Sequence, residues 1–187
     1  MLADPGNRAP APEPLRLVQA FVNTLDLENG IETLSSPAAL KSALAEIGVP
    51  LLGDRLSDAD LATALAAREA LRALALANSG LPLDARHVET FERVAEDARL
   101  TIRFAGSHAR LVPQAQGLEG ALGQIVAVVH EAMTDGTWWR LKGCPRDVCH
   151  WVFYDRSRNG SGKWCAMSVC GNRINTKSYR RRVSRRT

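Results

Sequence analysis

The sequence predicts a mainly α-helical protein with one small β-hairpin, followed by a small treble-clef-like module built on four cysteines. An α+β class is the alternative for the first part. Apolar residues recur at helical spacing through most of the first 136 residues, and two short alternating runs interrupt that pattern. All four cysteines lie between positions 144 and 170. We therefore divide the chain into a leader (1–14), a helical domain (15–136) and a cysteine module (137–187).

Five helices are predicted from apolar spacing and from the residues that begin or end helices. The first is amphipathic, with apolar positions from Leu15 to Leu25. The Ser36-Pro37 pair starts the second, because serine caps a helix and proline suits its first turn. The segment Ser57 to Asp60 resembles a capping box and starts the third. The predicted helices cover residues 15–25, 37–47, 58–78, 84–98 and 118–134.

A β-hairpin is predicted where two short alternating runs flank Gly106-Ser107. In the first run the alternation predicts that Thr101 and Arg103 face water. By the same alternation, Ile102 and Phe104 are predicted to pack inward against the helices.

The cytoplasm is the expected location. The leader is rich in proline and alanine and contains no apolar run of the kind that directs export. The longest apolar run of the chain, Ile125 to Val129, is far too short to cross a membrane. In a reducing compartment four clustered cysteines are more typical of metal ligands than of disulfides.

The four cysteines predict a structural zinc site. Zinc prefers four thiolates in a tetrahedron, and four cysteines fill that shell without leaving a position for water. Three alternatives stay open: an iron–sulfur cluster, disulfides in an exported protein, and His150 as a ligand in place of Cys149. The spacing is C-x4-C-x15-C-x4-C, and the predicted Zn2+ ligands are Cys144, Cys149, Cys165 and Cys170.

The chain between the two cysteine pairs is predicted to form a second hairpin. Residues 151–154 are the first strand, 159–162 the turn, and Lys163-Trp164 begins the return. Asp155 is expected to pair with a neighbouring arginine. A module of this size needs a metal because its own core is small. Most of the tryptophans are expected to pack around the zinc loops, with base stacking by one exposed ring as the alternative. All four lie inside or beside the module: Trp138, Trp139, Trp151 and Trp164.

The charge is divided sharply along the chain. From Gly136 onward there are 13 lysines and arginines against two acids, a net charge of +11. The first 135 residues hold 11 basic and 18 acidic residues, a net charge of −7. This asymmetry predicts two parts with different partners, and the basic part favours a polyanion such as nucleic acid.

The segment after the last cysteine is predicted to be a helix with a cationic face. Its basic residues recur at three- and four-residue steps, which gathers them on one side. Such a face can contact phosphates, while a solvated basic tail is the alternative. The predicted nucleic-acid contacts are Arg173, Lys177, Arg180, Arg181 and Arg182.

The segment that ends in Cys170-Gly171-Asn172-Arg173 resembles the CGNR zinc finger family over residues 138–182. The run at 15–26, with its Phe-Val-Asn-Thr, is similar to the start of the ABATE domain that precedes this finger. The resemblance implies a stress-induced bacterial transcription regulator with a DNA-binding finger and the four cysteines as its zinc ligands. In the motif, Gly171 is expected to let the chain turn tightly beside the metal.

The sequence therefore predicts a zinc-dependent DNA-binding regulator that is not an enzyme. Its candidate partners are DNA, a small-molecule effector at the helical domain and a second copy in a homodimer, with no membrane contact. The alternative is a zinc-stabilised adaptor for protein or RNA that reads no DNA sequence. An enzyme is the third hypothesis, and it would need a pocket around Asn23, Asp26 and Arg72.

Overall fold

Helices dominate the structure, a computed structural model that describes residues 10–51 and 55–172. All five predicted helices are present, and the strands of this part of the chain form three antiparallel pairs, so the predicted fold class is confirmed. The helices are α1 (Leu15–Val22), α2 (Pro37–Glu46), α3 (Asp58–Ala77), α4 (Ala85–Asp97) and α5 (Gly117–Thr134). The strands are β1 (Leu25–Asp26), β2 (Ile31–Glu32), β3 (Leu100–Ala105), β4 (His108–Pro113), β5 (Leu141–Gly143) and β6 (Val152–Tyr154).

Capping side chains begin the helices where the sequence predicts. At the start of α2 the Ser36 hydroxyl accepts a hydrogen bond from the N–H of Ala39 at 3.1 Å. At α3 the Ser57 hydroxyl accepts from the N–H of Asp60, and the Asp60 carboxylate accepts from the N–H of Ser57. These reciprocal bonds complete the predicted capping box. The side chain of Asp84 caps α4.

The first helix is shorter than predicted: it ends at Val22 and not at Leu25. The guanidinium of Arg72 donates to the C=O of Val22 at 2.8 Å, and Leu25 instead pairs with Glu32 in the β1–β2 hairpin. The sequence analysis missed this hairpin. Its signal is Asn29-Gly30 between the strands, a favoured pair for a tight turn, and Gly30 has a φ of 66°.

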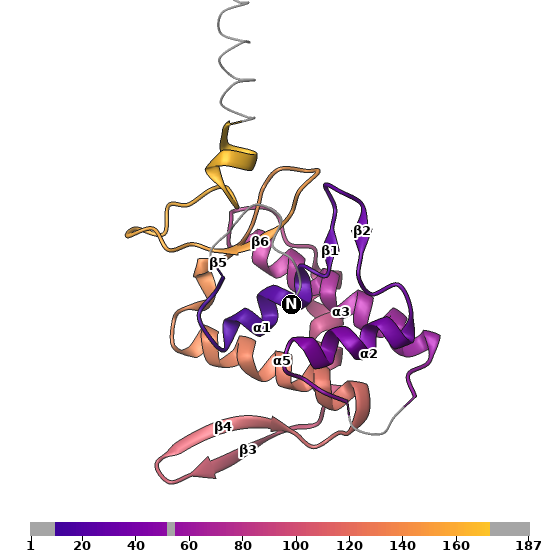
Figure 1. The fold of residues 1–187 in the computed structure, drawn as a ribbon. Helices are drawn as coiled ribbons and strands as arrows, with labels where there is room; N and C mark the ends of the chain where they lie inside the picture. The colour runs from indigo at the N-terminus through magenta and orange to yellow at the C-terminus, as the bar shows by residue number, and fades with distance from the viewer. Residues whose placement is uncertain (1–9, 52–54, 173–187) are drawn as a thin grey trace, which may run out of the picture.

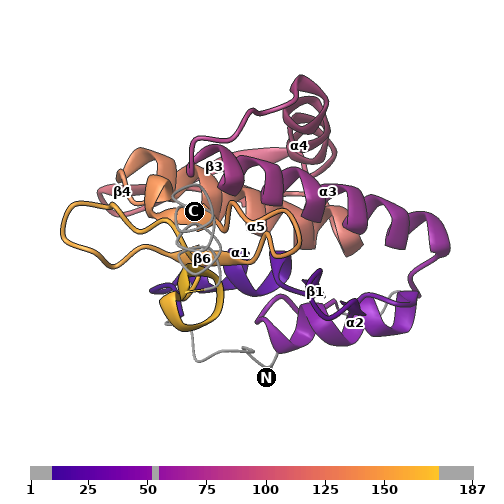
Figure 2. The same cartoon turned by 90° about the horizontal axis from the view of Figure 1, so that it is seen from above.

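The main core lies where α1, α3 and α5 pack on one another (Figures 1 and 2). Phe21, Leu71 and Ile125, one from each helix, are each at most 1% exposed. Helix α2 packs on α3, and α4 packs on α3 and α5. No helix in the described ranges is both long enough and apolar enough to span a membrane.

The β3–β4 hairpin is present as predicted, but its side chains do not pack as predicted. Ile102 is 57% exposed and Phe104 is 79% exposed. Alternation shows only that two side chains share a face of a strand. Leu100 packs on the main core and β4 contacts α5, but the tip of the hairpin extends away from the helices (Figure 1), so the core does not cover Ile102 and Phe104.

The β5–β6 hairpin of the cysteine module is packed into the main core. Leu141 and Val152 are fully buried in the same apolar cluster as the helices, and both strands contact α3. The predicted return strand at Lys163-Trp164 is wrong, because β6 pairs with β5, with Val152 opposite Gly143. The division of the chain at residue 136 stays a prediction.

Candidate metal centre

The first two cysteines lie at the ends of a tight loop that joins β5 to β6. Cys144 follows β5 directly, and its N–H donates to the C=O of Trp151 at 2.9 Å, which extends the hairpin by one pair. Inside the loop the N–H of Cys149 donates to the C=O of Arg146 at 2.8 Å. Both cysteines are therefore held by the backbone of one hairpin end.

The other two cysteines come from a second loop. Cys170 lies in a short π-helical turn, Met167–Gly171, and its N–H donates to the C=O of Ala166 at 3.0 Å. Neither a left-handed φ nor a rigid neighbour requires the glycine that follows Cys170, because the closest atoms belong to the flexible end of the Met167 side chain. The φ of Gly171 is outside the left-handed range, and a Cβ at this position would lie 2.6 Å from the Met167 sulfur.

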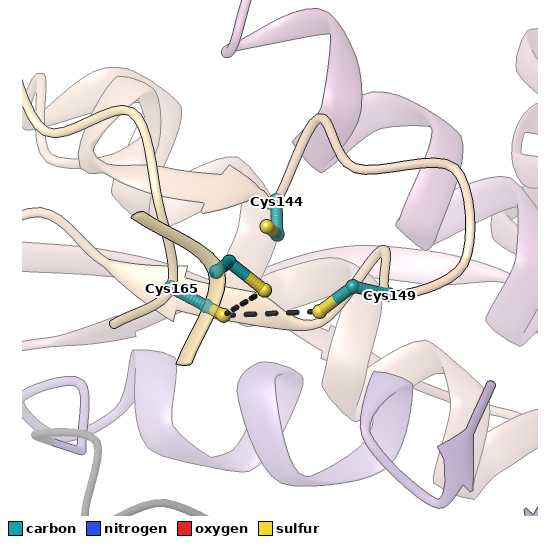
Figure 3. Close-up of side chains that lie close together, drawn as sticks. Cys144, Cys149 and Cys165 are labelled. Atoms are coloured by element: carbon teal, nitrogen blue, oxygen red, sulfur yellow. Dashed lines mark hydrogen bonds between the residues drawn. The ribbon is translucent and has the colours of Figure 1, made fainter. Parts of the chain in front are cut away.

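The four sulfurs form a compact, buried cluster, and Figure 3 shows those of Cys144, Cys149 and Cys165 close together. The Sγ atom of Cys165 lies 3.7 Å from that of Cys149 and 3.6 Å from that of Cys170, and all four sulfurs lie within 4.8 Å of one another. A tetrahedron with metal–sulfur bonds of about 2.3 Å has sulfur–sulfur edges of about 3.8 Å. The cluster therefore fits one tetrahedral ion.

The positions of the cysteine sulfurs can be compared with the three alternatives to a four-cysteine zinc site: disulfides, His150 as a ligand, and an iron–sulfur cluster. No disulfide joins any of the four cysteines. Cys149, rather than His150, contributes its side chain to the cluster. A limit of 4.8 Å between sulfurs leaves room for a single ion rather than for several iron and sulfide atoms. The four cysteines thus suit one metal ion.

The thiols are coupled to one another electrostatically. Hydrogen bonds from Cys149 and Cys165 lower the pKa of Cys144 to about 2, and the contacts with Cys144 and Cys165 raise the pKa of Cys149. The close packing of the sulfurs thus favours loss of the proton from Cys144 and disfavours it at Cys149. A cation that enters the cluster displaces the remaining thiol protons, because metals bind thiolates.

Arg146 links this cluster to the helical domain. Its Nη1 donates to Oε1 of Glu28 at 2.9 Å and to the Sγ of Cys170 at 3.6 Å. Glu28 lies in the loop of the β1–β2 hairpin, so that hairpin is tied to the edge of the metal centre. A donor to a ligand sulfur is a typical outer contact of a metal site. The sequence analysis did not predict this contact.

A buried ion pair joins β5 of the cysteine module to the residue that follows β6. The Lys142 ammonium donates to Oδ2 of Asp155 at 2.8 Å, and their side chains are 9% and 2% exposed. Burial alone raises the pKa of Asp155, but hydrogen bonds from Lys142 and from Ser157 outweigh it and hold the pKa at about 2. The predicted arginine partner is wrong: Arg140 donates to the backbone C=O of Asp155, and the carboxylate pairs with Lys142.

Polar side chains of the helical domain bind the outer edge of β6. The side-chain amide of Asn23 accepts from the N–H of Val152 at 2.9 Å and donates to its C=O at 2.8 Å, as a neighbouring strand would. Arg72, only 3% exposed, donates to the C=O of His150 at 3.1 Å as well as to the C=O of Val22. The two parts of the chain are therefore joined by partly buried hydrogen bonds.

The other strand is held in the same manner from the end of α3. The Asn78 amide donates to the carbonyls of Trp138 and Leu141 at 3.0 and 2.9 Å, and the Ser79 hydroxyl donates to that of Gly143 at 2.7 Å. These carbonyls would otherwise be buried without a donor, which is costly. The sequence offers one signal for such contacts, the polar pair Asn78-Ser79 directly after the Ala- and Leu-rich α3 helix.

The polar residues considered for a catalytic pocket have structural contacts. Asn23 and Arg72 hold β6, and the Asp26 carboxylate accepts from the backbone and side-chain N–H groups of Asn29. That the chain is not an enzyme stays a prediction.

The predicted nucleic-acid contacts lie outside the described residues, which end at Asn172. These are Arg173, Lys177, Arg180, Arg181 and Arg182. The described chain reaches Asn172 directly after the metal centre, so the basic segment begins two residues beyond Gly171.

A helical domain joined to a buried four-cysteine centre defines a protein of the zinc-finger class. Comparison with family models agrees. The chain belongs to the ABATE family, described as "Putative stress-induced transcription regulator", whose model matches residues 15–136. The CGNR zinc finger matches residues 140–183. The resemblance seen in the sequence is confirmed, and the pair of domains fits a regulatory role. A search of the curated proteins found no match.

Proposed function

We propose that this protein is a cytoplasmic transcription regulator whose cysteine module binds zinc and, in that state, DNA. The observation that carries the proposal is the buried cluster of four cysteine sulfurs, followed immediately by the basic segment. A metal at this position fixes where the basic segment starts, and the segment supplies the positive charge that DNA requires.

Zinc is the metal that best suits the donor set. Four thiolates in a tetrahedron are typical of structural zinc sites, in which every coordination position is taken by protein. The sulfur–sulfur distances of 3.6 and 3.7 Å match such a shell, and burial of all four cysteines protects it. When bound, the ion supplies folding energy and no reaction chemistry.

The helical domain is the part proposed to receive the signal. Asn23 and Arg72 bind β6, and Glu28 reaches Arg146 at the metal centre. A change in α1, α3 or the β1–β2 loop would therefore move the module that carries the basic segment. A small-molecule effector at this domain and a homodimer on a two-fold DNA site are parts of the proposal that follow from the regulatory role.

The test is fluorescence anisotropy of the zinc-loaded full chain on pooled genomic duplex fragments, over a salt series, with and without chelator. We expect binding that weakens steeply with salt and is lost when zinc is removed, because phosphate contacts release counterions and the module needs its metal. Folded, zinc-loaded protein that binds no duplex at low salt would overturn the proposal and favour the adaptor for protein or RNA.

A further inference from the structure

One exposed loop of the cysteine module carries positive charge and no acid. The finger loop, residues 156–164, connects β6 to Cys165 and contains three basic residues, all exposed: Arg156, Arg158 and Lys163. Asp155, the acid next to the loop, is buried and paired with Lys142. The loop therefore presents unbalanced positive charge to solvent.

The finger loop has a fixed shape despite its exposure. The Asp155 carboxylate accepts hydrogen bonds from the N–H groups of Ser157 and Gly162 at 2.9 and 2.8 Å. The ammonium of the buried Lys142 donates to the carbonyls of Gly160 and Gly162. A loop that is already ordered loses little conformational entropy when it binds a partner.

Trp139 supports the tip of the finger loop. A Cβ at Gly160 would lie 1.9 Å from the Trp139 ring, so the loop backbone rests directly on that ring. The ring is 44% exposed, and the Arg140 guanidinium lies 4.6 Å from its centroid. The Trp139 ring therefore helps to fix the loop tip, and Arg140 places a cation beside it.

The finger loop lies at the same end of the molecule as the turn Met167–Gly171, after which the basic segment begins (Figure 1). The β3–β4 hairpin lies at the other end. Of the three loop cations, Arg156 is partly engaged, because it donates to the C=O of Pro10 at 2.7 Å and lies over the Tyr154 ring. Arg158 and Lys163 are the stronger candidates for an external anion.

We propose that the finger loop binds the phosphate backbone of duplex DNA through Arg158 and Lys163, as a second contact beside the basic segment after Asn172. This inference rests on the proposed DNA-binding function and adds a surface that the basic segment does not include. Backbone contacts of this kind orient a protein on the duplex without reading sequence.

The test compares two double variants of the zinc-loaded full chain by anisotropy on a short random-sequence duplex over a salt series. R158Q/K163Q removes the proposed contacts. R103Q/R110Q is the matched control, because it removes the same charge from exposed arginines that face each other on the β3–β4 hairpin. Zinc content and melting temperature of both variants establish that they are folded.

We expect R158Q/K163Q to weaken binding roughly 60-fold at about 0.1 M salt and to reduce the slope of log K against log salt by about 2, since each phosphate contact contributes about 0.9 to that slope. The control should retain the wild-type slope. Equal losses in both variants, or none in R158Q/K163Q while the wild type binds, would overturn the finger-loop contact alone. A folded wild type that binds no duplex would overturn the proposed function as well. If R158Q/K163Q bound the duplex like the wild type but lost affinity for a single-stranded oligonucleotide in a parallel titration, the loop would be assigned to another nucleic acid and the proposal would be contradicted.

Discussion

Replacing Cys170 with alanine is expected to abolish zinc binding and to unfold the cysteine module. Metal binding contributes on the order of 10 kcal/mol to the folding of small zinc modules, which is comparable with the whole stability of an ordinary domain. Cys170 is fully buried among the other three sulfurs, so three thiolates would remain around an open position. The measurements are the zinc content per chain and the melting temperature.

The loss should also lower the stability of the helical domain. Leu141 and Val152 of the module are fully buried in the main core, and their departure would expose the faces of α1 and α3 that they cover. We therefore expect the wild type to melt in one transition, and chelation of the wild type to lower that transition as the variant does. Chelation removes the metal without removing a side chain. A lower melting temperature of the chelated wild type therefore reports loss of the metal and not a packing defect at position 170.

Val148→Ser is the control for this experiment, because Val148 is 53% exposed in the same loop as Cys149 and is not a ligand. It should bind one zinc and melt near the wild-type temperature. If Cys170→Ala kept equimolar zinc and the wild-type melting temperature, the four-cysteine site would be contradicted.

Lys142→Met is expected to destabilise the protein by about 3–5 kcal/mol, because it leaves a buried carboxylate without its cation. Asp155 would keep its hydrogen bonds from Ser157 and Gly162 but lose the ammonium at 2.8 Å. The finger loop would also lose the hydrogen bonds that Lys142 donates to two of its carbonyls, those of Gly160 and Gly162. Denaturant unfolding of the zinc-loaded chain measures the difference in free energy.

The partner variant separates the charge effect from packing. In Lys142→Met/Asp155→Asn the buried group is neutral, and we expect a smaller loss of stability than in Lys142→Met alone. Lys163→Met is the control, because Lys163 is an exposed lysine of the same module and its loss should change stability by less than about 0.5 kcal/mol. A Lys142→Met variant as stable as that control would show that the ion pair contributes nothing.

Local signals predicted the helices well. Ser36 and Ser57 cap α2 and α3 through bonds to residues three positions away, and such short-range groups are visible in a single sequence. The cysteine cluster was predictable for a related reason, since two short loops with thiols at both ends have few other uses in a reducing compartment. Gly30 carried an equally local signal, which was overlooked.

Contacts between distant parts of the chain were not predictable. Alternation placed Ile102 and Phe104 on one face of β3 but could not tell whether the core covers that face. The strand at 152–154 was located correctly, yet its partner lies before Cys144 rather than after the turn at 159–162. Asn23 and Val152 are 129 positions apart, and no pattern in one sequence joins them.

X-ray absorption at the zinc edge of the purified full chain, together with its metal content, tests whether the four cysteines bind one zinc ion. One zinc per chain with four sulfur neighbours at about 2.3 Å is expected. A first shell that contains nitrogen or oxygen, or a chain that carries iron instead of zinc, would contradict the four-thiolate zinc centre on which the proposed function rests.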